Sequence, residues 1–191
     1  MSLNLSHVWD TEEVGDLISW NKLLKAGIQA REEKAWLVRI SAKPKLRVYC
    51  RIKSSLRQEE YLRQVSLVQR KFLTRMREGT NNLRVETGRH LKEPLEARTC
   101  RICVQNVVED ETHFLLHCYV FERERTRLFR QIAAETGYSL EVMRGNDDWL
   151  IDVLIGHGLK SPEVRLHITR AVCRYLVRTL AKRERILSNR R

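Results

Sequence analysis

The stretch from Cys100 to Cys118 reads CRICVQNVVEDETHFLLHC, and the rest of the chain is organised around it. Two residues separate Cys100 from Cys103, nine separate Cys103 from His113, and four separate His113 from Cys118. Thiolate sulfur and imidazole nitrogen are ligands that Zn²⁺ prefers, and three sulfurs with one nitrogen complete a tetrahedron. Because this leaves no coordination position for a substrate water, the pattern predicts a structural zinc site formed by Cys100, Cys103, His113 and Cys118.

The second pair of ligands is expected on and just after a short helix. Residues 110–112 supply two acids and a capping side chain ahead of His113, which favours a helix that begins there. Cys118 would lie just past the end of that helix and face the cysteine turn. His117 is an alternative ligand, because a spacing of three residues from His113 is also found in zinc sites. We prefer Cys118.

Two other interpretations of the four residues remain open. They could be ordinary buried side chains, but the pattern is complete within nineteen residues, which favours a metal. They could instead form a pair of disulfides. The N-terminal residues MSLNLSHVWD lack the basic and apolar regions of a signal peptide, which argues against an oxidising compartment. The five cysteines therefore predict a nuclear or cytoplasmic protein.

The metal motif is followed by an aromatic, arginine- and glutamate-rich segment, YVFERERTRLF, over residues 119–129. Together they resemble the zinc segment near the C-terminal end of non-LTR, LINE-type retrotransposon polyproteins, downstream of the reverse transcriptase. The phrases LRVETGRH over residues 83–90 and LRVYCRIKSSLRQEEYL over residues 46–62 are similar to the same family. The resemblance covers roughly residues 45–135.

This resemblance implies a CCHC-type zinc element that helps to hold template RNA or target DNA during reverse transcription. The chain would then be a derivative of such an element, or a piece cut out of one. It departs from the family at Tyr119, where many members carry proline after the last cysteine. The helix boundary at that position is therefore less sharply defined by the sequence.

Composition and charge favour a helical, nucleic-acid-binding protein. With 191 residues, 42% of them hydrophobic, the chain can bury a substantial core. Its 36 lysines and arginines against 24 acids give a net charge of +12, which is typical of proteins whose partners are rich in phosphate. No run of eighteen apolar residues is present, so we expect no membrane partner.

Apolar residues recur at helical spacing along most of the chain, which predicts a mainly α fold with an embedded zinc element. We expect an N-terminal helical pair in residues 1–44 and a helical body in residues 45–191, with the zinc element at 98–120. The charged residues of 119–136 and the basic tail AKRERILSNRR are expected to be solvated. The expected helices are 11–26, ending at Gly27, then 29–41, 58–78, 119–136, two short ones within 138–160, and one from Pro162 to Leu180.

Two groups of cations are candidates for contacts with the nucleic-acid backbone. The first lies between Lys43 and Arg57, where six cations occur with no acid among them; a solvated charged face is the alternative. The second surrounds the zinc segment, with Gly88 expected at a turn that needs unusual dihedral angles. Arginine suits phosphate because its planar group donates two hydrogen bonds at once. The predicted binding residues are Lys45, Arg47, Arg51, Lys53, Arg84, Arg89, Arg98 and Arg101.

No catalytic motif accompanies these features, and we predict that the chain is not an enzyme. Asp147, Asp148 and Asp152 are close in sequence, but no strand with a spaced Asp/Glu-x-Lys accompanies them, as a nuclease would require. No phosphate-binding glycine loop is visible either. The leading hypothesis is a zinc-stabilised module that binds RNA or DNA through backbone contacts. The alternative is a zinc-stabilised helical adaptor that contacts other protein subunits and binds no nucleic acid.

Overall fold

The structure, a computed structural model, describes residue 10 and residues 16–156, 158–159 and 161–190. Most of these residues are helical, and the described part contains no sheet, only a single bridge between Thr99 and Val108. The predicted mainly α class is confirmed. Within the described chain, no helix is both long and apolar enough to cross a bilayer.

The helices of the described chain, in order, are α2 (Leu17–Ser41), η1 (Pro44–Leu46), α3 (Arg47–Ile52), α4 (Tyr61–Gln64), α5 (Leu67–Arg77), α6 (Arg84–His90), η2 (Leu95–Ala97), the π-helix η3 (His113–His117), η4 (Tyr119–Phe121), α7 (Glu122–Thr136), α8 (Leu140–Arg144), α9 (Asp147–Leu154) and α10 (Pro162–Ser188).

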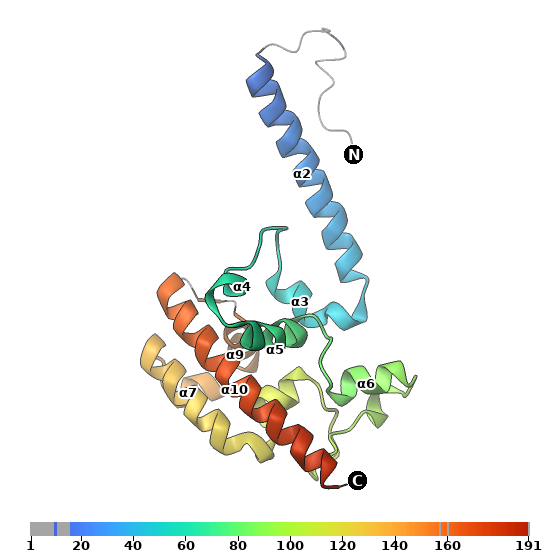
Figure 1. Cartoon of the computed structure of the whole chain (residues 1–191), viewed down its shortest axis with the longest axis vertical. Helices are drawn as coiled ribbons and strands as arrows, with labels where there is room; N and C mark the ends of the chain where they lie inside the picture. Colours follow the sequence, from blue (N-terminus) through green and yellow to red (C-terminus); the bar gives the residue numbers. More distant parts are fainter. Residues whose placement is uncertain (1–9, 11–15, 157, 160, 191) are drawn as a thin grey trace.

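The long helix α10 is the centre of the helical body. It packs against α7 and α5, and α9 and α4 also contact it (Figure 1). Its apolar face, which includes Ile168, Val172 and Leu176, is almost completely buried. The same core takes in Phe114 of η3, so the predicted metal segment is packed directly onto the main helices. Removing this apolar surface from water is the main force that stabilises the body.

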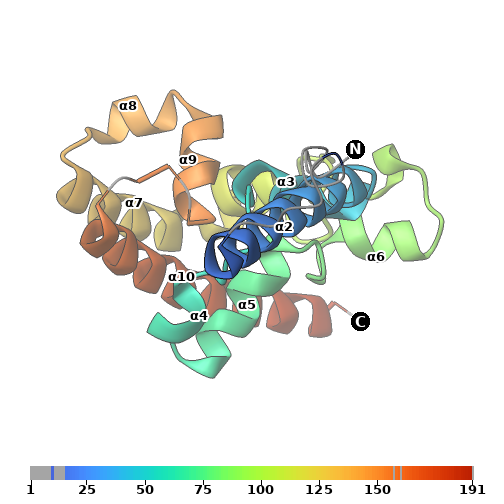
Figure 2. The ribbon, with the colours of Figure 1, turned by 90° about the horizontal axis from the view of Figure 1, so that it is seen from above.

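The N-terminal helix α2 projects away from this body, and only its C-terminal end contacts α3 and η1 (Figures 1 and 2). Trp36 of α2 packs edge to face against Tyr49 of α3, with 6.1 Å between ring centroids. The expected break at Gly27 is wrong, because α2 continues through it as one helix of 25 residues. A glycine inside a helix costs only about 1 kcal/mol, which the surrounding turns outweigh. Residues 11–15 of the expected first helix lie outside the described residues.

The start of α10 is confirmed, since Ser161 caps it and Pro162 is its first residue. Its end is not the expected one. Instead of a solvated tail, the helix continues to Ser188, because Lys182 and the buried Arg183 bind groups of the body. The end of α7 at Gly137 agrees with the prediction, and this glycine adopts a left-handed conformation with φ of +75°.

The single helix expected over residues 58–78 is divided into α4 and α5. Ser66 has an extended backbone and caps α5, because its hydroxyl accepts the Gln69 N–H while the Gln69 side chain accepts the Ser66 N–H. The sequence contains this capping box as Ser-x-x-Gln. Apolar residues recur at helical spacing on both sides of it, which is why a single helix was expected. Gly79 follows α5 with φ of +60°, and a Cβ there would lie 2.1 Å from the Lys45 carbonyl oxygen.

Candidate metal centre

The four predicted ligands come together in the structure. The Sγ atoms of Cys100, Cys103 and Cys118 and a ring nitrogen of His113 all lie within 4.8 Å of one another, and all four residues are buried. Cys103 Sγ is 3.5 Å from His113 Nε2, and none of the cysteines is in a disulfide. Zinc–sulfur bonds of about 2.3 Å place two sulfurs of a tetrahedron about 3.8 Å apart. The group therefore has the dimensions of a four-ligand metal site.

The first two ligands lie at a turn closed by a short antiparallel pairing. The Cys100 N–H donates to the Val107 carbonyl at 2.8 Å, and the Glu109 N–H donates to the Arg98 carbonyl at 3.0 Å. Between these partners the chain reverses at Asn106, which has φ of +51°. Asparagine tolerates this left-handed conformation better than most residues. Local backbone bonds thus hold both thiols on the same side of the turn.

The second two ligands lie at the ends of a π-helical turn, which explains their spacing. The Cys118 N–H donates to the His113 carbonyl at 2.7 Å, a bond between residues five apart. In an α-helix such residues would point about 140° away from each other, whereas the wider π turn brings them to the same side. Asp110 starts the turn by accepting the His113 N–H at 2.7 Å. The expected helix start and the position of Cys118 just past its end are confirmed.

Arg125 stabilises the C-terminal end of this π-helical turn. Its side chain is 2% exposed, and it donates to the carbonyls of Leu115, at 2.9 Å, and Cys118, while Glu122 pairs with it at 2.9 Å. The Cys118 carbonyl also accepts the Phe121 N–H at 3.1 Å, so Arg125 is its second donor. The expectation that the arginines of residues 119–136 only face solvent is wrong for Arg125. Its Arg-rich sequence context gave no sign of burial.

A buried ion pair connects the metal centre to α10. Arg183 donates to both oxygens of Glu109, at 2.7 and 2.6 Å, and Glu109 also accepts the backbone N–H of Arg84 at 2.9 Å. Glu109 Oε1 is 3.8 Å from the sulfur of Cys100. Both charged side chains are almost fully buried, at 1% and 3% exposure. Glu109 and Arg183 are site residues that sequence analysis missed, because they are 74 positions apart.

The thiols influence one another strongly. The hydrogen bond with Cys118, together with burial, raises the pKa of Cys100 to about 12, while the same bond lowers the pKa of Cys118. Burial raises the pKa of Cys103. Such a set of thiols gains most from a cation that binds the deprotonated sulfurs. With four protein ligands the site would be closed, so a bound metal would stabilise the fold and would not activate a water.

The alternative ligand His117 points elsewhere. Its side chain is half exposed, and its Nε2 lies 2.8 Å from Asp147 Oδ2. It is outside the group of four residues whose ligand atoms converge. The preference for Cys118 is therefore supported by the geometry.

The first predicted cationic segment is largely paired within the protein. Arg47 bonds to the buried carboxylates of Glu86, at 2.8 Å, and Glu111, whereas Arg51 pairs with Asp148 and Asp152 at 3.1 and 3.0 Å. These partners stand 39 or more positions away in the sequence. The three aspartates that were considered as a nuclease cluster include two that neutralise Arg51.

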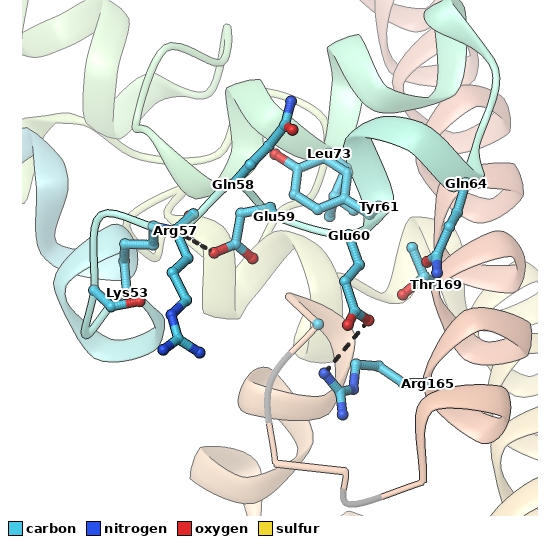
Figure 3. Close-up of a pocket in the computed structure, with 12 residues that line it drawn as sticks. Lys53, Arg57, Gln58, Glu59, Glu60, Tyr61, Gln64, Leu73, Arg165 and Thr169 are labelled. Carbon is cyan, nitrogen blue, oxygen red and sulfur yellow. Dashed lines mark hydrogen bonds and ion pairs between the residues drawn. The ribbon is translucent and has the colours of Figure 1, made fainter. Parts of the chain in front are cut away.

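Lys53 lines a pocket and is not part of an exposed charged face (Figure 3). It is 7% exposed and pairs with Glu59 at 2.5 Å, while Arg77 bonds to the same carboxylate at 2.8 Å. Burial raises the pKa of Glu59, but these two cations outweigh it and the pKa is lowered overall. On the opposite side of the pocket, Glu60 and Arg165 form an ion pair at 3.7 Å (Figure 3). The pocket is therefore lined by charges that neutralise one another.

The second predicted cationic group also has mainly internal partners. Arg84 is buried and pairs with Glu93, and Arg89 bonds to Glu86 at 2.8 Å. Arg98 donates to the carbonyls of Glu93 and Val85.

Gly88 explains part of this packing. It lies inside α6, not at the expected turn, and a Cβ there would lie 2.6 Å from the Arg98 side chain. Of the predicted binding residues, Arg101 is exposed and Lys45 is half-buried, and neither forms an ion pair with a described residue.

Comparison with known proteins gives no relative for this chain: no protein-family model, curated protein or solved structure matches it. What the metal centre and the charged surface do is therefore inferred from the residues of the chain itself.

Proposed function

We propose that Cys100, Cys103, His113 and Cys118 bind one Zn²⁺ that stabilises the domain. Three sulfurs and one imidazole form a donor set that zinc prefers, and their burial and convergence support a closed, structural site. The metal would join the turn after Arg98 to the π-helical turn before α7. A metal that binds only the folded state contributes its binding free energy to folding.

Elemental analysis of the purified protein tests this proposal. We expect one zinc per chain, and we expect Cys118→Ser to remove it and to lower the melting temperature. Cys50→Ser is the matched control, because Cys50 is a free, half-buried cysteine outside the site. A protein that is folded and free of zinc, with the same melting temperature after chelator treatment, would refute the proposal.

We propose further that the domain binds nucleic acid through backbone contacts. The observation that carries this proposal is the charge left over after internal pairing. Each buried ion pair, such as Glu109 with Arg183, removes one charge of each sign. Among the described residues, five cations and three acids are buried, so most of the excess of 36 cations over 24 acids lies on half-buried and exposed side chains. Such an excess of positive charge attracts polyanions and makes their binding strongly dependent on salt.

Fluorescence anisotropy with a labelled 20-nucleotide DNA or RNA tests this function. We expect log K to fall linearly with log salt, with a slope of about −0.7 to −0.9 per phosphate contacted. Absence of binding at low salt, or affinity that does not change with salt, would reject it. The resemblance to LINE-type retrotransposon proteins predicts the same activity and remains a prediction from the motif.

A protein-interaction role is the second candidate, and the exposed apolar side chains of α2 favour it. This helix projects from the body (Figure 1), and Ile18 and Val38 are 67% and 63% exposed. Contiguous exposed apolar surface is typical of protein contact sites. If α2 binds a partner subunit, Ile28→Glu with Val38→Glu should release that subunit and leave nucleic-acid binding unchanged. Complexes that survive the double substitution would exclude α2 as the contact.

A further inference from the structure

The groove between α7 and α10 carries a row of arginines that sequence analysis did not select. The two helices run side by side in both views of the ribbon (Figures 1 and 2). Two adjoining hollows lie between them and share Gln131, Ala171 and Arg174 in their walls, so they form one continuous groove. Its walls carry four exposed arginines, Arg127 on α7 and Arg170, Arg174 and Arg178 on α10.

A polar contact between the helices lies toward each end of the groove. Lys182 pairs with Glu124 at 3.0 Å near one end, and His167 lies 3.2 Å from Glu135 near the other. These are the acids in the groove walls, and both face a partner across the groove. Between them, none of the four arginines forms an ion pair with a described residue. The middle of the groove is therefore lined by cations without a counter-charge from the described chain.

This arrangement is not explained by the stability of the fold. Arg170, Arg174 and Arg178 are spaced four residues apart, and like charges at this spacing repel one another along a helix. Near the candidate metal site, by contrast, Arg183 is buried and paired with Glu109. A row of unpaired arginines costs helix stability, so it indicates a ligand that supplies the negative charge.

The chemistry of the groove favours a phosphate backbone over an acidic protein. Neither α7 nor α10, both fully described, has a large apolar side chain among the exposed ones. Protein interfaces depend on buried apolar and aromatic anchors, whereas backbone binding of nucleic acid depends on charge. Successive arginines on α10 rise by about 6 Å along the helix, which gives a linear series of donors. A single row of donors of this kind matches one phosphodiester strand.

From these observations we infer that the α7–α10 groove binds one phosphodiester strand, with Arg127, Arg170, Arg174 and Arg178 as its phosphate ligands. The strand comes from a single-stranded nucleic acid or from one edge of a duplex. This inference rests on the proposed nucleic-acid binding and places it on a surface other than the predicted residues near the metal centre.

The test compares the binding of a labelled 20-nucleotide strand and of its duplex by the wild type and three variants of the whole chain. The groove variant carries R127Q, R170Q, R174Q and R178Q. The control carries K22Q, K25Q, K34Q and R39Q, four exposed cations of α2, so both variants have lost the same charge. The third variant, R101Q, changes the exposed arginine in the turn that carries Cys100 and Cys103. Unchanged metal content and melting temperature establish that each variant is folded.

We expect the groove variant to lose about tenfold in affinity per arginine at about 0.1 M salt, and its salt slope to be shallower by about 0.9 per arginine. The α2 control should bind within threefold of the wild type, because its four cations lie outside the groove and would not contact the strand. A loss of affinity for either the single strand or the duplex supports the inference. The form that the wild type binds more tightly identifies the source of the strand.

Other outcomes overturn the inference in distinguishable ways. Equal losses in the groove variant and the α2 control would mean that only net charge matters. A loss of affinity in R101Q alone would place the binding site at the turn that carries Cys100 and Cys103. Both results leave nucleic-acid binding intact and remove the groove from it. Displacement of the strand by an equal length of polyglutamate would show that the groove takes acidic protein. No binding by the wild type would refute the proposed function itself.

Discussion

Replacing Glu109 by glutamine tests how the metal centre is joined to the helical body. The amide keeps the size of the side chain and can still accept the Arg84 N–H, but it removes the negative charge beside Arg183. Burial lowers the pKa of Arg183, yet the bonds to Glu109 outweigh it and the pKa is raised overall. Arg183 is 3% exposed, so in the variant its charge would be buried without a partner.

Removing one partner of a buried ion pair costs about 3–5 kcal/mol, a large part of a typical total of about 5–15 kcal/mol. We therefore expect Glu109→Gln to lower the free energy of unfolding by about 3–5 kcal/mol, and Arg183→Met to do the same. The double variant should cost less than the sum of the two, with a coupling of about 1–3 kcal/mol, because it contains no unpaired charge.

Urea unfolding of zinc-loaded protein, followed by circular dichroism, measures these differences. Glu184→Gln is the matched control, since Glu184 follows Arg183 on the same helix and is exposed; its effect should stay within about 0.5 kcal/mol. A loss below about 1 kcal/mol for Glu109→Gln, or strictly additive single effects, would refute the reasoning from burial.

Three further predictions follow from the same structure. Gly79→Ala should destabilise the protein by about 2 kcal/mol or more in thermal melts, because φ is +60° and a Cβ would meet the Lys45 carbonyl, whereas Gly145→Ala should be tolerated; equal melting temperatures would contradict this. Arg125→Met should remove the hydrogen bonds that Arg125 donates to two carbonyls of the π turn and weaken zinc retention against a chelator, and retention equal to that of the wild type would argue against a supporting role. Because its pKa is lowered in the folded state, Glu59 should stabilise the protein above about pH 4.3 and lose this contribution as the pH falls through the folded value; Glu59→Gln should remove that part of the acid sensitivity, and an unchanged pH profile would count against it.

Sequence alone determined the features that depend on neighbouring residues. The four metal ligands were identified because they lie within nineteen positions and their spacing matches local turns. The start of α10 at Pro162 and the end of α7 at Gly137 followed from capping chemistry, which acts within one helical turn. Sequence periodicity also sufficed for the helical class.

The tertiary structure decided which charges are free. Arg47 and Arg51 looked like surface cations, but their acidic partners come from segments 39 or more positions away, which no local pattern reveals. Arg125 and Arg183 were buried for the same reason, while Arg174 and its neighbours on α10 were left exposed. An ion pair depends on distance in space, and that distance is fixed only when the helices pack. The four residues that could hold a metal were therefore recognisable in the sequence, whereas the arginines that are exposed and unpaired could be identified only in the fold.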